Sequence, residues 1–292
     1  MAKLDYHIFK GAVNSYFSLY TGGKERPAYF DIQQTFPALD ELTRAFPDVK
    51  AELDNVLTQR PRLRRYQDID PGEAKITNVN PEKSWSVFML YILGHLPEEN
   101  RALCPKTCAV LDRIPGLIQA FFSVLDPGKS VPAHEGPYYG YLRYHLALQV
   151  PTESPPKLVV DGKDYVWKEG EAVLFDDSHT HEVVNHSPQT RAVLIVDVRR
   201  PMPFMPSLLN RFVTDVVARH TYGRSIMKRI KKAASLPASR ERQRPEFVPP
   251  VADAPGSPGS RLVVSSPPRY PPPAESSPCL CSPPPCSSPG WR

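Results

Sequence analysis

The sequence has no long apolar segment. Its longest uninterrupted apolar run, Val87 to Leu93, is much shorter than the roughly 20 residues that a membrane-spanning helix requires. The amino-terminal residues Met1 to His7 also lack the apolar stretch of a secretory signal. These absences predict a soluble protein that stays in the cytoplasm.

Cysteine is scarce, and the five cysteines do not form a disulfide pattern. Cys104 and Cys108 are four residues apart in an expected helix, and Cys279, Cys281 and Cys286 fall in a low-complexity segment. This usage is typical of a reducing compartment.

Over most of the chain, Lys and Arg do not outnumber Asp and Glu. The formal net charge is +5, but residues 204–234 hold seven Lys and Arg against one Asp, and the residues after them add six Arg against four acidic residues. These segments contribute +6 and +2, so residues 1–203 carry a net −3. Such a balance gives no nucleic-acid footprint, and we expect no nucleic-acid partner.

Proline, in contrast, is abundant and unevenly distributed. Of the 35 prolines, 16 lie between Pro237 and Pro289, where serine is also frequent. Such a segment buries too little apolar surface to offset its ordering entropy, so we expect a disordered tail. The expected organisation is a helical and mixed region at 1–115 that packs on the core, a β core at 116–203, a basic helix at 204–235 and the tail at 236–292.

The apolar pattern predicts helices first and strands later. Spacing near 3.6 residues predicts helices over 4–20 and 39–57, the second bent near Pro47, and a strand at 85–93 precedes a helix at 97–114. From Leu117 onward, short segments rich in β-branched and aromatic residues alternate with turns, which favours an all-β sandwich or barrel with helices outside it. The predicted strands are 117–125, 141–150, 157–161, 164–167, 171–176, 181–185 and 190–198.

Residues 204–234 alternate apolar and basic positions, as an amphipathic helix does. In one interpretation the basic face is solvated while the other face packs on the β core. In the other, the helix binds peripherally to an anionic surface, which for a cytoplasmic protein is the inner face of the membrane. Both interpretations fit the sequence equally well.

Four of the eight histidines, at positions 134, 145, 179 and 181, lie in the predicted β region near strand ends. We expect His134 in a turn immediately before a strand, His181 at the exit of another strand, and His179 as a solvent-facing turn residue. An imidazole at the rim of a barrel can bind a metal ion through one nitrogen while an acceptor orients the other. A lone histidine is more often an ordinary turn residue, so the hypothesis depends on the neighbouring residues.

Strand alternation brings charged and polar residues to the same interior. Arg143 and His145 share one face of the strand at 141–150. Arg191 is the only charge before Asp197 in an apolar strand, and a buried guanidinium needs an anionic partner, either a protein carboxylate or a dicarboxylate ligand. Asp197 or Glu182 is an alternative partner for Arg143, and a core hydroxyl is one for His145.

Two histidines and an inward arginine are expected parts of a 2-oxoglutarate-dependent iron site. The usual third ligand in such sites is a carboxylate, which lies two residues after the first histidine. That position is Gly136 here, and the adjacent Glu135 is expected to point away from His134 in an extended segment. The residues alone therefore predict a site with one ligand fewer than usual.

A glycine in place of that carboxylate is a feature of the aspartyl/asparaginyl β-hydroxylase family, which this sequence resembles from about Phe121 to Pro203. No single matching segment is specific, but together they are. The segments are Phe122-Ser123-Val124-Leu125, His134-Glu135-Gly136-Pro137, Leu142-Arg143-Tyr144-His145-Leu146, Trp167 to Gly170, Phe175-Asp176-Asp177-Ser178 and His181-Glu182-Val183.

The resemblance implies a fold and a set of ligands. The fold would be mainly β with flanking helices, around a double-stranded β-helix of the jelly-roll or cupin-like kind. His134 and His181 would bind Fe(II), while Ser123, Arg143, His145 and Arg191 would contact 2-oxoglutarate. Asp176 and Asp177 would orient an iron-bound water or a histidine, or would simply end a turn.

The resemblance also implies a hydroxylase that uses dioxygen. Its substrate would be an aliphatic C–H bond, first of all the β-carbon of an Asp or Asn residue in a peptide or carrier-bound substrate. The alternative is a fatty acyl chain of a membrane lipid, because related bacterial enzymes act on lipid A and ornithine lipids. Those enzymes are expected to keep an acidic residue where Gly136 stands, so the glycine favours the first substrate. A third hypothesis is an inactive barrel that acts as a binding module.

Overall fold

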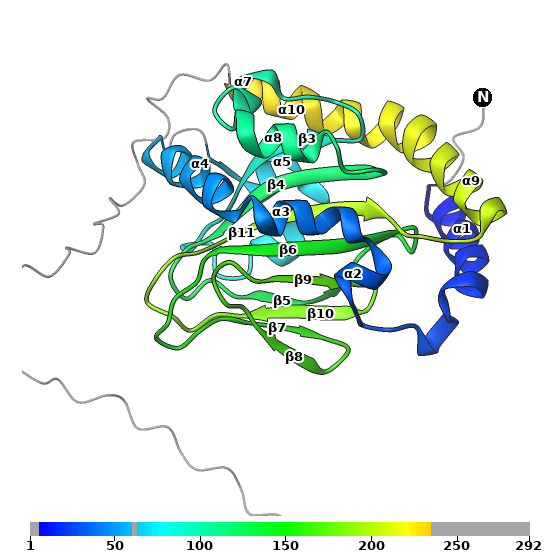
Figure 1. The fold of residues 1–292 in the computed structure, drawn as a ribbon, viewed down its shortest axis with the longest axis horizontal. Coiled ribbons are helices and arrows are strands. Elements are labelled where there is room, and N and C mark those ends of the chain that lie inside the picture. The colour runs from blue at the N-terminus through cyan, green and yellow to red at the C-terminus, as the bar shows by residue number, and fades with distance from the viewer. Residues whose placement is uncertain (1–5, 60–62, 235–292) are drawn as a thin grey trace, which may run out of the picture. The chain divides into compact units, whose positions relative to one another are not determined.

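The computed structural model describes residues 6–59 and 63–234. These residues belong to a compact unit, Met1–Arg244, and a second unit, Pro245–Arg292, lies outside the described residues. The tail expected at 236–292 therefore also lies outside them. Two antiparallel sheets form the centre of the described unit, and helices lie on the outer face of one of them (Figure 1).

The major sheet has seven strands in the order β1-β9-β6-β11-β4-β3-β2, and the minor sheet has four in the order β5-β10-β7-β8. The strands are β1 Tyr29–Phe30, β2 Arg64–Arg65, β3 Trp85–Ile92, β4 Leu117–Leu125, β5 Val131–Glu135, β6 Tyr141–Gln149, β7 Lys157–Val160, β8 Lys163–Val166, β9 Ala172–Phe175, β10 Thr180–Val184 and β11 Arg191–Arg199. β1, β2 and β3 come from residues 1–115, so that region extends the sheet as well as packing on it.

The chain from β4 to β11 crosses repeatedly between the two sheets. β4, β6, β9 and β11 lie in the major sheet, whereas β5, the β7–β8 hairpin and β10 lie in the minor sheet. This alternation is the topology of a double-stranded β-helix, and it confirms the predicted fold. All seven strands predicted from Leu117 onward are present, within one residue at each end. β5 is additional, so the prediction that His134 lies in a turn was wrong: it lies in a strand.

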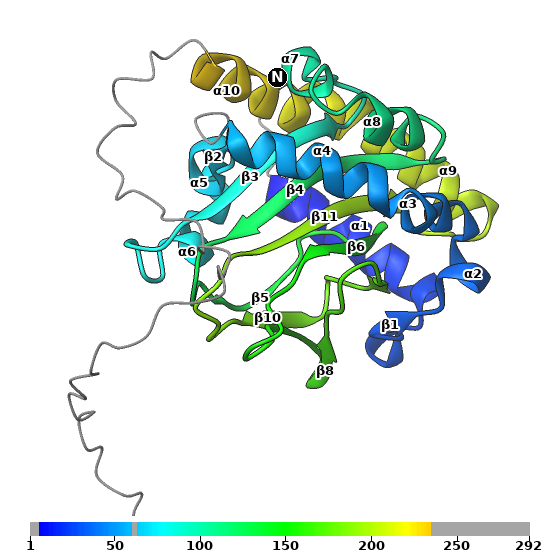
Figure 2. The same ribbon diagram turned by 60° about the vertical axis from the view of Figure 1, so that its left-hand side comes forward.

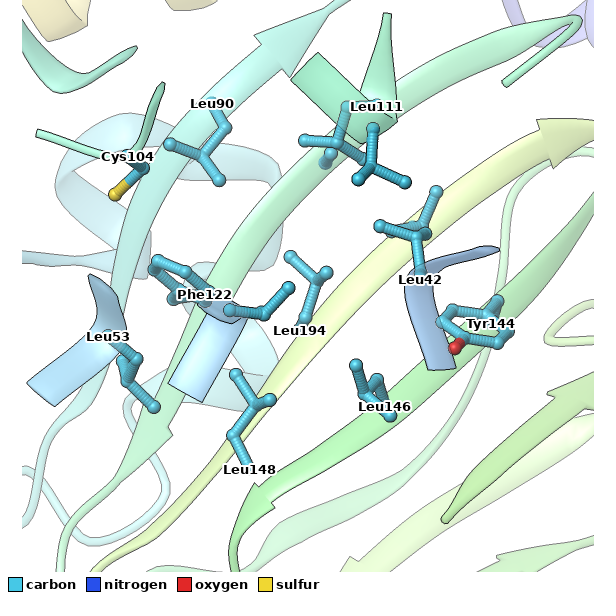
Figure 3. Packing of buried hydrophobic residues seen from close by; sticks show 14 of the residues in the cluster. Leu42, Leu53, Leu90, Cys104, Leu111, Phe122, Tyr144, Leu146, Leu148 and Leu194 are labelled. Carbon is cyan, nitrogen blue, oxygen red and sulfur yellow. The ribbon is translucent and has the colours of Figure 1, made fainter. Parts of the chain in front are cut away.

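The two faces of the major sheet bury different kinds of side chain. Alternate residues such as Phe122, Leu146 and Leu194 pack against helical residues such as Leu42 and Leu53, in the cluster drawn in Figure 3. The residues between them belong to a second cluster, which includes Leu158, Val160 and Val183 of the minor sheet. Figure 2 shows strands of both sheets, with β5 and β10 below β6 in this view. Because side chains alternate along each strand, one face of the major sheet packs against the helices and the other lines the barrel interior.

Short helices cover the outer face of the major sheet. Prolines set their limits: Pro47 lies in the first turn of α4, so the helix predicted at 39–57 breaks at Ala45 into α3 and α4. The helix predicted at 97–114 is likewise two helices, because Pro105 forces Cys104 out of helical geometry. The helices up to residue 111 are α1 Tyr6–Thr21, α2 Ile32–Thr35, α3 Asp40–Arg44, α4 Phe46–Thr58, α5 Tyr66–Ile69, α6 Ala74–Thr77, α7 Glu98–Arg101 and α8 Pro105–Leu111. Residues of α3, α4 and α8 pack on the outer face, whereas Tyr66 and Ile69 of α5 belong to the cluster on the other face.

The predicted amphipathic helix at 204–234 is present as one continuous helix with a π-helical middle (Figure 1). It consists of α9 Phe204–Phe212, the π-helix Val213–Gly223 and α10 Arg224–Ala234. None of the helices described for this chain is both long and apolar enough to cross a membrane.

Candidate functional site

Two histidines meet where β5 and β10 pair. His134 and His181 are directly opposite in the register, and their ring centroids are 4.1 Å apart. The Nδ1 of His134 donates to the carbonyl of Pro132 at 2.8 Å, and the Nδ1 of His181 donates to the carbonyl of His179 at 2.9 Å. A carbonyl only accepts, so each neutral ring carries its proton on Nδ1 and keeps an Nε2 lone pair free.

Both rings are neutral at physiological pH. Burial lowers the pKa of His134 to about 4 and that of His181 also to about 4. A metal ion binds the unprotonated nitrogen, so this pair needs to lose no proton before binding one. Two fixed Nε2 atoms on adjacent strands can therefore serve as a pair of metal ligands.

Arg191 is a buried cation with no acidic partner among the residues that the structure describes. Its side chain is 1% exposed, and its Nε and Nη2 atoms have no hydrogen-bond partner. The guanidinium lies 3.9 Å above the ring of Trp167, and burial lowers its pKa to about 9. An unpaired buried charge is costly, so this arrangement indicates a site built for an anion.

His145 and Ser123 lie in the same interior. Neither ring nitrogen of His145 has a hydrogen-bond partner within the described part of the chain, and the ring lies between Trp167 and Phe175, at centroid distances of 5.9 and 4.9 Å. The core hydroxyl considered as a partner for His145 is therefore absent. Ser123 Oγ accepts a 3.0 Å hydrogen bond from Trp85 Nε1, which leaves its own proton available to a ligand.

Arg143 differs from Arg191 because its charge is already neutralised. Its Nε and Nη2 each donate at 2.8 Å to the carboxylate of Asp197, the first of the two acids considered as partners. Its Nη1 lies 3.1 Å from Oδ2 of Asp177. Tyr141 also donates to that oxygen at 2.7 Å, whereas Oδ1 of Asp177 is buried without a partner. Burial raises the pKa of Asp177 to about 6, against the opposing effect of Arg143.

The carboxylate of Asp177 fills the space beside Gly136. A Cβ atom at position 136 would lie 2.5 Å from Asp177 Oδ1 and 2.6 Å from its Cγ. The φ angle of Gly136 is not positive, so the backbone itself does not demand glycine. Glycine is required here because a carboxylate from another strand end occupies the position of its side chain.

The neighbouring Asp176 has a structural role. Its carboxylate is fully buried and binds Arg26, Arg200 and the backbone and hydroxyl of Ser178. His179, predicted to face solvent, is in fact buried because its Nε2 bonds to the carbonyl of Arg26 at 3.0 Å. Of the two aspartates considered for the site, Asp177 is the one that contacts a residue of the site, Arg143.

One pocket brings together all the residues predicted from the sequence. Among the described residues, no three His, Cys, Asp or Glu side chains converge on one point. The sequence did not single out Trp85 or the role of Tyr141. The pocket is lined by Ser123, His134, Arg143, His145, His181 and Arg191, together with Trp85 and apolar residues.

Glu73 is a further acidic group near this pocket that the sequence did not indicate. It ends the turn Pro71–Glu73, and burial raises its pKa to about 7, with additional effects from Asp70, Arg143 and Asp177. The charge of the pocket residue Arg143, and that of Asp177 beside it, therefore act on Glu73.

We expect Glu73→Gln to stabilise the protein at pH 8 by about 2 kcal/mol and to have no effect near pH 4.5. A raised carboxyl pKa means that the folded protein holds the proton more tightly than the unfolded chain, so wild-type stability falls between about pH 4.5 and pH 7. Glutamine does not titrate and removes that fall. Urea denaturation of both proteins at the two pH values measures the difference, and an equal effect at both would contradict the assigned titration.

Comparison with known proteins gives consistent matches. The family model of aspartyl/asparaginyl beta-hydroxylase matches residues 43–201. The ornithine lipid ester-linked acyl 2-hydroxylase of Rhizobium tropici is 40% identical over 169 residues, or 58% of this chain and 59% of that protein. The human aspartyl/asparaginyl beta-hydroxylase is 35% identical over 129 residues, or 42% of this chain and 17% of that protein.

The chain thus spans less than two thirds of the length of either relative. Among solved structures, a prolyl-4-hydroxylase from Pseudomonas putida matches with a TM-score of 0.40 and 17% identity, over 66% of this chain and 100% of that one. The fold assignment rests on the strand order of the chain itself.

Proposed function

Because this chain belongs to the aspartyl/asparaginyl β-hydroxylase family, we propose that it is an Fe(II)- and 2-oxoglutarate-dependent dioxygenase that hydroxylates an aliphatic C–H bond. The observation that carries the proposal is the buried, unpartnered Arg191 in the same pocket as two histidines with free Nε2 atoms. Iron, 2-oxoglutarate and dioxygen supply the oxidising chemistry when bound, and the protein supplies position, charge and exclusion of water.

The donor set fits a divalent iron ion. His134 and His181 would hold it through their Nε2 atoms, each fixed in tautomer and orientation by a backbone carbonyl. Imidazole suits iron among several metals, and two neutral ligands leave open positions for the other reactants. The two histidines are therefore the proposed metal ligands.

The remaining polar groups fit a dicarboxylate. Arg191 would bind a carboxylate of 2-oxoglutarate, because its Nε and Nη2 donors match a carboxylate and no described acidic residue pairs with its charge. His145 and Ser123 would add hydrogen bonds to the same ligand. Arg143, which the resemblance also assigned to it, holds Asp197 and Asp177 in place and would act on 2-oxoglutarate at most through its charge.

Asp177 would provide the negative charge that Gly136 lacks. Its Oδ1 has no partner and lies next to the glycine, while Tyr141 and Arg143 hold its other oxygen. Through Oδ1 it would accept a hydrogen bond from a water held beside His134 and His181. A carboxylate would thereby act near the metal without binding it.

The substrate would carry its C–H bond next to a carbonyl. The β-carbon of an Asp or Asn residue adjoins the side-chain carbonyl, and carbon 2 of an ester-linked acyl chain adjoins the ester carbonyl. The two relatives compared above are named for these two reactions. Gly136 favours the peptide substrate, whereas the greater coverage of the lipid-modifying relative and the exposed apolar residues of α9 favour the acyl chain.

The first experiment is a visible spectrum of the anaerobic protein with Fe(II), before and after addition of 2-oxoglutarate. We expect a weak charge-transfer band that appears only with the cosubstrate and is lost in His181→Ala. His186→Ala is the matched control, because His186 is an exposed histidine on the same segment. Absence of the band in folded wild-type protein would refute the proposal and favour the binding-module hypothesis.

A second experiment separates the substrates. Asp- and Asn-containing peptides and an ester-linked acyl lipid are incubated with the iron-loaded protein, 2-oxoglutarate and air. The product is the one that gains the mass of an oxygen atom with matching release of succinate. Succinate released equally without any substrate would mean that neither is the substrate.

A further inference from the structure

The outer face of α9 is apolar and exposed. Its residues at positions 204, 208 and 212, spaced by four, lie on one side of the helix, with position 205 beside them and position 216 continuing the row into the π-helix. We call these residues the α9 stripe. Their exposed fractions are Phe204 78%, Met205 64%, Leu208 53%, Phe212 54% and Val216 44%.

The stripe is not the side of α9 that packs on the rest of the protein. The opposite side of the same helix is packed, with Pro206 and Asn210 buried and Leu209 against a cluster of Val13, Phe17 and Val213. Exposing two phenylalanines on a helix that is already anchored costs solubility without adding stability. A contiguous exposed apolar surface of this kind indicates an interaction site.

The helix that bears the stripe is attached at the end of the barrel where the histidines and Arg143 lie. Asn210 of α9 donates to the carbonyl of Gly140 at 2.6 Å and accepts a hydrogen bond from Tyr138 at 2.9 Å. Both residues belong to the loop between β5, which carries His134, and β6, which carries Arg143. A surface that docks through the stripe therefore lies near the proposed active site.

The helix that bears the stripe is basic. Arg211 is exposed on the same helix, and Arg224, Lys228, Arg229 and Lys231 are exposed along the continuation of the helix into α10. The one acidic residue of the segment, Asp215, is paired with Arg199. The apolar side of α10 is packed, because Ile226 is buried in the core cluster and the partly buried Met227 and Ile230 pack against it, so its basic side faces outward.

We propose that this helix docks the protein on an anionic membrane, with the α9 stripe inserted among the lipids and the basic residues of α10 on the headgroups. Apolar side chains next to cationic ones on a surface helix match a bilayer interface, whose acyl region is apolar and whose headgroups are negative. Docking does not depend on the chemistry of the pocket. Its consequence, that an acyl chain of a membrane lipid is the substrate class, rests on the proposed function.

The test is flotation of the full chain with vesicles of phosphatidylcholine, with and without phosphatidylglycerol. We expect binding to the anionic vesicles only. Phe204→Ser, Leu208→Ser and Phe212→Ser together should weaken partitioning roughly 100-fold, since each removes an inserted apolar side chain. Lys228→Gln and Lys231→Gln should each weaken it about fivefold.

A matched control carries Val79→Ser, Leu96→Ser and Val166→Ser, which remove three exposed apolar residues that lie outside α9 and should leave flotation unchanged. The spectrum with Fe(II) and 2-oxoglutarate should be the same in the stripe variant as in the wild type, so a failure of docking is distinct from a failure of the proposed function. Wild-type protein that never floats, or a stripe variant that floats as well as the wild type, would refute the proposal. So would a wild-type dimer that the stripe variant loses, because the stripe would then bind a second copy.

Discussion

Arg191→Met is expected to make the protein more stable and to abolish the binding of 2-oxoglutarate. The guanidinium is buried without an acidic partner, and its lowered pKa, about 9, reflects the cost of holding that charge away from water. Methionine keeps the apolar stem and removes the charge, so the unfolding free energy without ligand should rise by about 2–4 kcal/mol. The affinity for 2-oxoglutarate should fall at least ~100-fold.

Thermal unfolding with and without 2-oxoglutarate measures both effects. Saturating ligand at roughly 100 times its dissociation constant stabilises a protein by about 2.7 kcal/mol, and this increment should vanish in the variant. Unchanged ligand-induced stabilisation would exclude Arg191 as the carboxylate-binding residue. A loss of stability in Arg191→Met would show that the charge is compensated in the folded protein.

Arg143→Met is the matched comparison, with the opposite expected sign. Arg143 lies in the same pocket, but it neutralises Asp197 and Asp177, and removing it takes away the cation that these two buried carboxylates share. The expected cost is about 3–5 kcal/mol of unfolding free energy. The two variants thus distinguish an arginine that stabilises the fold, Arg143, from one that binds a ligand, Arg191.

The sequence predicted those parts of the site that local patterns encode. The strands from Leu117 onward follow from alternation and turn residues, and Arg191 is visible as a lone charge in an apolar strand. β5 was not predicted because Pro132 and Ala133 are untypical of a strand and the turn residues Gly136 and Pro137 follow it directly. His134 was therefore identified as a candidate ligand but placed in the wrong element.

The contacts that the sequence could not give come from distant segments. The register that sets His134 opposite His181 depends on the pairing of β5 with β10, which no local pattern determines. The buried ring of His179 forms a hydrogen bond with the carbonyl of Arg26, which is 153 residues earlier in the chain. The roles of Asp177 and Gly136 likewise become clear only when both are seen in space.

Gly136→Asp is expected to destroy the site rather than to complete it with a third ligand. Any side chain at position 136 places its Cβ 2.5 Å from Asp177 Oδ1, and that carboxylate cannot easily yield because Tyr141 and Arg143 hold it. Gly136→Ala, which adds only the Cβ, should already cost about 1–3 kcal/mol of unfolding free energy. Both variants should lose the charge-transfer band, because the displaced Asp177 disturbs the strand ends that carry the histidines.

A double-mutant cycle tests the steric cause directly. Asp177→Ala removes the atoms that a Cβ at position 136 would meet, so the Gly136→Ala change should cost about 1–2 kcal/mol less in an Asp177→Ala background than in the wild type. Urea denaturation of the four proteins gives this coupling energy. If the two costs simply add, the glycine is required for another reason, such as the approach of substrate. If they couple as expected, the carboxylate of Asp177 occupies the space of the acidic side chain that usually follows the first histidine by two residues. Gly136 and the two-histidine site are then consequences of that exchange.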